Sequence, residues 1–493
     1  MAQISVNGLT FCYDGAYTDV FTDVSFSVDT SWRLGLVGRN GRGKTTLLRI
    51  LLGELEYRGS VSSPVVFSYF PREPENPDET CEEILERLSG GALRWKILRE
   101  TGAIGLEEEM LYRPYSTLSG GEKTKLLLAT QFLRENGFPL IDEPTNHLDE
   151  EGREAVERYL ASKSGFILVS HDRRFLDRTV DHIMSINRSG IEISAGNFSV
   201  WYENRQRRDA FEMRENERLT RDIARLESSS RQAAGWADKA EASKKGDPSV
   251  ENKMGWAPYA GAKSAKKQKA RKAMEKRTMR QAEEKKSLLK DLEKTEELKI
   301  TPLQFYKSRM LEASGLSLYY GDRAVAEDIS FTIERGDRAA VAGRNGSGKS
   351  TLLKLVCGED IRHEGTFISA SGLRISHVPQ DASFLKGTVY SYAEETGCDL
   401  TRFLTILRKL DMPRELFERD MSGYSMGQKK KVLLAASLAT DAHLYVWDEP
   451  LNYIDIFSRI QIEELLRSFA PTIMFVEHDA AFRENIANKT IEM

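Results

Sequence analysis

Cysteine is scarce in this sequence, and long apolar runs are missing from it. The 493 residues include four cysteines, which lie far apart at Cys12, Cys81, Cys357 and Cys398. So few cysteines at such distances exclude a disulfide framework and a cysteine-based metal cluster. No run of about 18 apolar residues occurs, so we predict no membrane-spanning helix. The first residues, MAQISVNGLTF, lack the basic and apolar regions of a secretory signal. We therefore expect a cytoplasmic protein with no membrane partner.

Net charge is also small, but the charge is distributed unevenly. The chain carries 71 basic and 75 acidic residues. Between Lys263 and Arg280, however, nine residues are Lys or Arg and one, Glu275, is acidic. A basic run of this kind is either a solvated helix face or a surface that neutralises nucleic-acid phosphates.

The chain contains a long internal repeat. Four motifs recur in the same order, 305 to 307 residues apart. They are GRNGRGKTTLLRIL and GRNGSGKSTLLKLV, LSGGEKTKLLLA and YSMGQKKKVLLA, IDEPTNHLD and WDEPLNYID, and VSHD and VEHD. Because each copy alternates short apolar strands with helices, we predict an α/β fold with a largely parallel sheet. The duplicated domains are expected at residues 1–200 and 305–493.

The segment between the copies, residues 201–304, is predicted to be a helical hairpin. Its first arm, about 201–227, has Leu219, Ile223 and Leu226 at helical spacing, and its second arm is expected over about 264–298. Glycines and prolines interrupt the region between them, so the tip is predicted at about 244–261.

Each copy contains the pattern GxxxxGK[ST]. Its glycines let backbone amides surround phosphate oxygens, its lysine reaches the β- and γ-phosphates, and its hydroxyl binds magnesium. A chance glycine loop is the alternative, but two matches, each between a strand and an apolar helix, disfavour it. The residues predicted to hold ATP here are Gly38, Asn40, Gly41, Gly43, Lys44, Thr45 and Thr46, and Gly343, Asn345, Gly346, Gly348, Lys349, Ser350 and Thr351.

An apolar strand in each copy ends in a pair of acids, Asp142–Glu143 and Asp448–Glu449. The aspartates are predicted to hold Mg²⁺ together with Thr45 and Ser350. The glutamates are predicted to act as general bases on the attacking water. A solvated acidic pair is the alternative, which its recurrence in both copies disfavours.

LSGGE, from Leu118 to Glu122, resembles the signature motif of the ATP-binding-cassette ATPases. His171 and His478 match the histidine of that family. The resemblance implies two tandem P-loop cassettes that pack head to tail. Each ATP would lie between the glycine loop of one cassette and the signature of the other. The further residues that it implies around ATP are Ser119, Gly120, Gly121 and Glu122 opposite Lys349, Ser425, Gly427 and Gln428 opposite Lys44, and Tyr13 and Tyr320 as adenine-stacking aromatics.

Two departures from the family pattern make the sites unequal. Gln380 matches the glutamine that contacts magnesium and the γ-phosphate, but Arg72 stands at the matching place in the first copy. Met426 replaces the first glycine of the second signature, where we expect its side chain to crowd the ATP held by Lys44.

Three classes share tandem or paired cassettes. Importer ATPases lack a basic hairpin, and DNA-repair ATPases carry a very long coiled coil or zinc cysteines. The whole chain is most similar to the third class, the ABC-F family, whose cassettes are joined by an α-helical coiled-coil hairpin. GWADKAEASKKG and AGAKSAKKQKARK resemble the Lsa-type resistance proteins.

The ABC-F resemblance implies a cytoplasmic ATP hydrolase that uses ATP and Mg²⁺ and pairs its own cassettes as a monomer. The implied partner is the bacterial 70S ribosome. There the hairpin would enter the E site toward the P-site tRNA and the 23S rRNA, and would protect against lincosamides, streptogramin A and pleuromutilins. A housekeeping factor for stalled ribosomes is the alternative, and an importer ATPase subunit is a further one.

Overall fold

The computed structural model describes residues 2–15, 19–146, 148–187, 190–242, 277, 280, 298–300, 302–321, 323–344 and 346–493. It does not describe the side chains of residues 227, 229–242 and 320. The chain divides into two compact units, one formed by Met1–Trp201 with Thr295–Met493 and one by Tyr202–Lys294. The first unit contains both copies of the repeat, here called the first and second domains. The predicted hairpin tip and most of its second arm fall outside the described residues.

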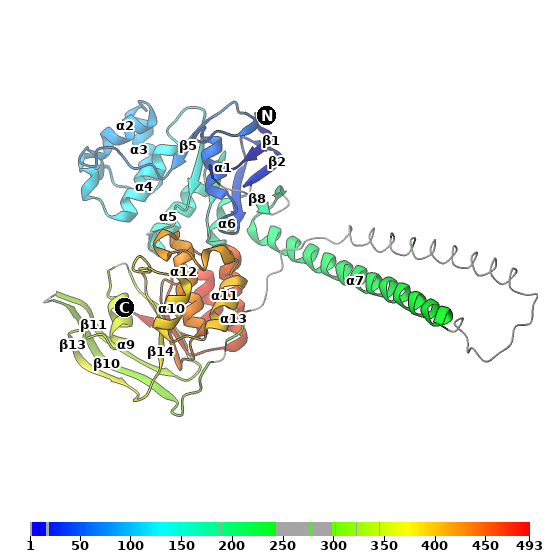
Figure 1. Cartoon of the computed structure of the whole chain (residues 1–493). Coiled ribbons are helices and arrows are strands. Elements are labelled where there is room, and N and C mark those ends of the chain that lie inside the picture. Colours follow the sequence, from blue (N-terminus) through cyan, green and yellow to red (C-terminus); the bar gives the residue numbers. More distant parts are fainter. Residues whose placement is uncertain are drawn as a thin grey trace, which may run out of the picture. The chain divides into compact units, whose positions relative to one another are not determined.

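The first domain contains two sheets (Figure 1). An antiparallel sheet has the order β2-β1-β4, and a larger one has the order β5-β6-β7-β3-β8-β9, parallel except for β9. The strands are β1 (Gln3–Phe11), β2 (Phe21–Asp29), β3 (Arg33–Gly38), β4 (Arg58–Ser62), β5 (Val66–Phe70), β6 (Gly137–Asp142), β7 (Phe166–Val169), β8 (His182–Asn187) and β9 (Gly190–Ala195). The predicted α/β class is confirmed, and the antiparallel sheet adds to it.

Helices and short 3-10 turns of the first domain follow the strands of the parallel sheet or lie between β5 and β6. They are α1 (Lys44–Leu51), α2 (Cys81–Ser89), α3 (Arg94–Ala103), η1 (Glu108–Tyr112), η2 (Tyr115–Thr117), α4 (Gly120–Gln131), α5 (Glu150–Ala161) and α6 (Arg173–Thr179). The strands β3 and β7 are buried along almost their whole length, as expected where helices cover both faces of a parallel sheet.

The second domain repeats this plan. Its antiparallel sheet has the order β11-β10-β13, and its parallel sheet has the order β14-β15-β16-β12-β17. The strands are β10 (Arg309–Tyr320), β11 (Arg323–Glu334), β12 (Arg338–Ala342), β13 (His363–Ser369), β14 (Ile375–Val378), β15 (Leu444–Asp448), β16 (Ile473–Val476) and β17 (Lys489–Glu492). The helical elements are α9 (Lys349–Val356), α10 (Val389–Thr396), α11 (Leu400–Lys409), η3 (Arg414–Leu416), η4 (Met421–Gly423), α12 (Met426–Ala439), α13 (Ile456–Phe469) and α14 (Ala480–Ile486).

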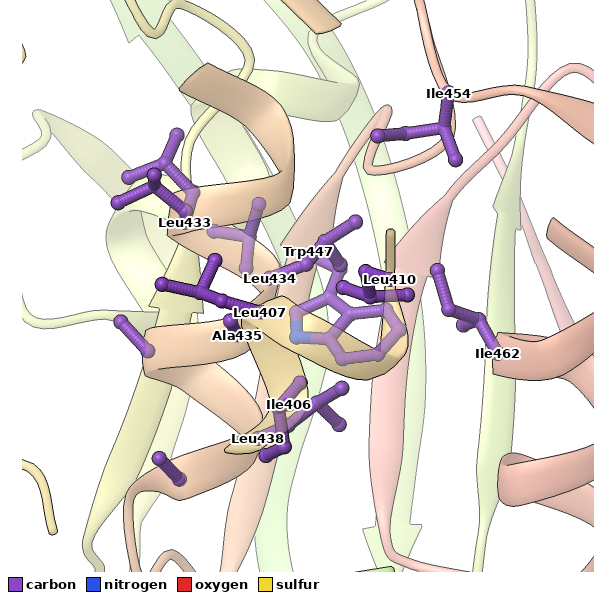
Figure 2. Packing of buried hydrophobic residues seen from close by; sticks show 14 of the residues in the cluster. Ile406, Leu407, Leu410, Leu433, Leu434, Ala435, Leu438, Trp447, Ile454 and Ile462 are labelled. Carbon is purple, nitrogen blue, oxygen red and sulfur yellow. The ribbon is translucent and has the colours of Figure 1, made fainter. Parts of the chain in front are cut away.

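Trp447 lies at the centre of the second domain's largest core (Figure 2). Its indole is fully buried on β15, and its Nε1 donates a hydrogen bond to Ser437 Oγ at 3.0 Å. Side chains of α11 and α12 surround it, among them Leu407 and Leu434. This core fixes α12, whose first turn carries the second signature, to the strand that carries Asp448.

Parallel pairing brings the chemistry-bearing residues to one edge of each sheet. Asp142 lies opposite Val169 in the register of β6 and β7, and β3 ends beside them at Gly38. Since ligands bind at the carboxyl ends of parallel strands, the glycine loop, the acidic pair and His171 converge there.

The linker begins with one long helix, α7 (Phe198–Ala242). Asn197 starts it, because its side-chain oxygen accepts a hydrogen bond from the Val200 amide at 3.1 Å. The helix begins earlier and ends later than the predicted 201–227. The residues after Glu227 are mostly strong helix formers, so the cost of Gly235, about 1 kcal/mol, does not stop it. Among the described residues no helix is long and apolar enough to cross a membrane.

Candidate ATP-binding sites

The first glycine loop holds its lysine by backbone contacts. Lys44 Nζ donates to the Gly38 carbonyl at 2.7 Å and lies 3.4 Å from Asn40 Oδ1. Gly43 has φ 90°, and a Cβ there would come within 2.6 Å of Val20. Only glycine therefore fits where the loop turns into α1. Burial lowers the pKa of Lys44, and a bound phosphate would supply the negative charge that offsets this.

The second loop has the same design. Lys349 Nζ donates to the carbonyls of Gly343 and Arg344, each at 2.8 Å. Gly348 has φ 91° and precedes α9. Asn345, which was predicted to belong to this loop, lies outside the described residues.

Asp142 is held where it could bind Mg²⁺. Its Oδ2 accepts hydrogen bonds from Thr45 Oγ1 and Tyr69 Oη, each at 3.2 Å. In the second domain, Asp448 Oδ1 is buried and has no hydrogen-bond partner among the described residues. Carboxylate and hydroxyl oxygens are the ligands that Mg²⁺ prefers. Both sites therefore fit the cation.

The two predicted bases share a geometry but differ in acidity. His171 Nε2 lies 3.3 Å from Glu143 Oε1, and His478 Nε2 lies 3.3 Å from Glu449 Oε1. Burial, followed by the charge of Asp142, raises the pKa of Glu143 to about 8.

Burial would also raise the pKa of Glu449. Hydrogen bonding from His478 and Gln380 outweighs burial and holds that pKa below its ordinary value. The surroundings of the two glutamates thus shift their pKa values in opposite directions.

Both signatures are capping boxes at helix starts. Ser119 Oγ accepts from the Glu122 amide at 3.3 Å, and Glu122 Oε2 accepts from the Ser119 amide at 2.7 Å. Ser425 and Gln428 make the same exchange at 3.3 and 2.9 Å. Each box begins a helix, α4 or α12, so the positive end of that helix dipole lies at the signature. Glu122 and Gln428 are thus occupied in capping, and their contact with ATP remains a prediction.

The first site combines residues of both domains. Its pocket, about 480 Å³, is lined by Tyr13, Val20, Asn40, Gly41, Gly43, Lys44, Thr45, Thr46, Asp142, Glu143, Asn146, Val169, His171, Ser425, Met426, Gly427 and Tyr453. Asn40 Nδ2 donates to the Tyr453 carbonyl at 2.9 Å. A Cβ at Gly427 would lie 2.6 Å from that carbonyl oxygen, which explains the glycine. Lys44, Ser425 and Gly427 therefore line one pocket, and their joint contact with ATP remains a prediction.

The second site is assembled differently. Its pocket, about 390 Å³, is lined by Asn146, Leu148, Arg153, Val325, Gly346, Gly348, Lys349, Ser350, Thr351, Gln380, Glu449, Asn452, Tyr453 and His478. Ser119 and Gly121 are not among the described residues that line this second pocket. Gly121 lies next to this pocket, because a Cβ there would be 3.5 Å from Leu148, and the contact of the first signature with ATP at Lys349 remains a prediction. Arg153 reaches across, and its guanidinium donates to the His478 carbonyl at 3.2 Å.

Three further predicted positions have distinct outcomes. Tyr13 lines the first pocket with its hydroxyl 2.9 Å from Thr46 Oγ1. The side chain of Tyr320 lies outside what the structure describes. Arg72 lines a separate cavity, about 280 Å³, beside Tyr69. The hydroxyl of Tyr69, rather than a glutamine amide, contacts Asp142, and no sequence signal identified it.

Met426 is one of the residues that line the first pocket. It also packs on the hydrophobic core of the second domain and starts α12. Whether it crowds ATP remains a prediction.

Two nucleotide-binding domains with glycine loops, acidic pairs and capped signatures define an ATP-binding-cassette protein. A family model described as ABC transporter matches residues 21–146 and 326–452, which together span half of the chain. The chain belongs to this family and carries two of its ATP-binding domains.

Similar proteins place the chain in the ABC-F branch. The ATP-binding protein Uup of Caulobacter vibrioides is 30% identical over 97% of this chain and 75% of its own length. The ribosome protection protein VmlR of Bacillus subtilis is 28% identical over 96% and 83%. The energy-dependent translational throttle protein EttA of Escherichia coli is 25% identical over 96% and 89%.

Solved structures agree on the fold. The archaeal ribosome recycling factor aABCE1, solved with the stalk protein aP1, has a TM-score of 0.63 at 20% identity. The match covers 98% of this chain and 87% of that one. The RNase-L inhibitor has the same score and identity, with 99% and 87% covered. At this identity the likeness supports the tandem-cassette fold alone.

Proposed function

We propose that this chain is an ATP-driven ribosome-binding factor. ATP would bridge the glycine loop of each domain to the signature of the other. The linker, residues 201–304, would then enter the E site of the bacterial 70S ribosome, toward the P-site tRNA and the 23S rRNA near the peptidyl-transferase centre. The observation that carries the proposal is the two-domain first site, which gives ATP a means to hold the domains together.

Hydrolysis would release the factor. Thr45 with Asp142, and Ser350 with Asp448 and Gln380, would hold Mg²⁺, which neutralises charge on the transferred phosphate. Glu143 and Glu449 would take the proton of the attacking water, each oriented by the nearby histidine. The lowered pKa of Glu449 favours its ionised form at neutral pH, whereas the raised pKa of Glu143 disfavours it.

The relatives support the ribosome as the partner. Two of them, VmlR and EttA, are named for ribosome protection and for control of translation, and each matches 96% of this chain. The basic run between Lys263 and Arg280 supplies the phosphate-neutralising charge that such a partner needs.

Ribosome co-sedimentation tests this proposal. In the Glu143→Gln/Glu449→Gln protein, ATP binding without hydrolysis should hold the protein on 70S particles, at moderate salt and less so at high salt. Lys44→Ala/Lys349→Ala is the matched control, which should not pellet with ATP. If the double-glutamine protein binds ATP yet stays at the top of the gradient, the ribosome is not its partner.

We propose further that this factor protects ribosomes from lincosamides, streptogramin A and pleuromutilins, as the resemblance to Lsa-type proteins implies. Expression in a susceptible strain should raise the inhibitory concentrations of these drugs and leave those of drugs acting elsewhere unchanged. The similarity to EttA favours a second candidate, a housekeeping factor. Its mark would be altered growth without drug and no change in susceptibility.

A further inference from the structure

The glycine loop of the first site contacts the second domain through a buried arginine. Arg39 lies between Gly38 and Asn40 and is 7% exposed. Its guanidinium carbon lies 5.9 Å from the ring centroid of Phe457, in the first turn of α13. Its Nη1 lies 3.8 Å from Asp411 Oδ2. Because both side chains are buried, we expect a displacement of the glycine loop to shift Phe457 as well.

Phe457 also touches the start of the linker helix. Its ring centroid lies 6.2 Å from that of Trp201, at an interplanar angle of 62°. Trp201 lies 5.5 Å from the ring of Phe198, the first residue of α7. These three aromatic residues are each at most 6% exposed. Arg39, Phe457, Trp201 and Phe198 thus form a continuous row from the glycine loop to the first turn of α7.

The duplicated position at the second site is built differently. By the repeat, Arg344 corresponds to Arg39, and Glu151 corresponds to Phe457. Arg344 and Glu151 also meet across the domains, at 2.8 Å, but their side chains are 79% and 76% exposed. An exposed ion pair of this kind is screened and weak. The equivalent contact is therefore buried and aromatic at one site and solvated at the other.

We infer that Phe457 is a positioning residue that links the glycine loop of the first ATP site to the start of α7. Nucleotide at the first site would fix Arg39, and Arg39 would fix Phe457 and Trp201. The second site, with Glu151 in the equivalent place, would act on α7 only through overall closure of the domains. This inference rests on the proposed function, because it identifies which ATP site controls the linker. Coupling is reciprocal, so a change at Trp201 should in turn alter ATP affinity at the first site.

Hydrogen exchange in the full-length Glu143→Gln/Glu449→Gln protein tests the inference without ribosomes. We expect ATP with Mg²⁺ to slow amide exchange in the first turns of α7. Phe457→Leu keeps an apolar side chain but removes the ring, and should reduce that ATP effect by roughly fivefold or more. Glu151→Gln is the matched control at the equivalent position and should leave the effect intact. ATP binding and melting temperature, measured on each variant, show that the compared proteins are folded and loaded.

Three results would overturn the inference. They are an unchanged ATP effect in Phe457→Leu, an equal loss in Glu151→Gln, and a parent protein that binds ATP with no response in α7. Trp201→Leu gives a second test in a Lys349→Ala background, where ATP affinity at the first site should fall roughly fivefold. An unchanged affinity there would also count against the link. Failure to pellet with ribosomes would refute the proposed function while leaving this exchange result unaffected.

Discussion

The difference in acidity between the two glutamates makes the pH profile of hydrolysis a direct test of the site geometry. Glu449→Gln leaves Glu143 as the base at the first site, and Glu143→Gln leaves Glu449 at the second. A base must be ionised to accept a proton. The pKa of Glu143 is raised to about 8 by burial and by Asp142, whereas the pKa of Glu449 is lowered.

The expected magnitude follows from these directions. With a pKa of about 8, roughly a tenth of Glu143 is ionised at pH 7 and roughly nine tenths at pH 9. Hydrolysis by Glu449→Gln should therefore rise about tenfold between these pH values. Hydrolysis by Glu143→Gln should be flat over the same range, because Glu449 is already ionised at pH 7.

Single-turnover hydrolysis with ATP in excess of its dissociation constant is the assay, and the double-glutamine protein sets the background. The charge of Mg²⁺ acts on both glutamates, so the comparison between the two variants isolates the contribution of the protein. Parallel profiles for the two single variants would refute the reasoning. They would mean that the local surroundings of Glu143 and Glu449 do not set their proton affinities during turnover.

Further predictions concern packing and contacts at the sites. Gly427→Ala should weaken ATP-dependent closure by roughly 1–3 kcal/mol, because its Cβ would lie 2.9 Å from Asn40 Nδ2 of the first domain, besides 2.6 Å from the Tyr453 carbonyl of its own domain. Gly423→Ala, whose Cβ would meet no atom within 4 Å, is the control in the same domain and should bind ATP normally. Tyr69→Phe should weaken Mg²⁺-dependent ATP binding at the first site alone. ATP titration in a Lys349→Ala background measures the first site, and titration in a Lys44→Ala background measures the second. Trp447→Ala should lower the free energy of unfolding by about 3–5 kcal/mol, measured by denaturant titration; a loss below about 1 kcal/mol would contradict its central place in the core.

The sequence predicts those parts of the sites that depend on local chemistry. A strand followed by GxxxxGK[ST] and an apolar helix predicts one loop conformation, which both copies adopt. The carboxyl ends of parallel strands then bring the acids and histidines beside it. The serine and the acid or amide three residues later, in both signatures, are likewise a local helix start. The predicted α/β fold is confirmed for these reasons.

Contacts between the domains lie beyond such reasoning. Nothing in the pattern near Phe457 indicates that it meets both Arg39 and Trp201. These contacts depend on how two folded surfaces meet, which side-chain spacing along the chain does not encode. The same holds for the absence of Ser119 and Gly121 from the lining of the second pocket in the described structure. The prediction of about 201–227 for the first arm stops short of the end of α7 at Ala242, because the apolar spacing on which it rests ends at Leu226.

Fusion of the two copies into one chain has a consequence for symmetry. In a pair of identical chains, each substitution appears at both interfaces at once. Here Phe457 and Glu151 occupy equivalent positions and differ, as do Gln380 and Arg72. Two ATP sites that descend from one design can therefore acquire an order of events. If one site acts before the other, the ATP cycle of the paired domains runs in a fixed order. Two identical domains would need an outside partner to set such an order.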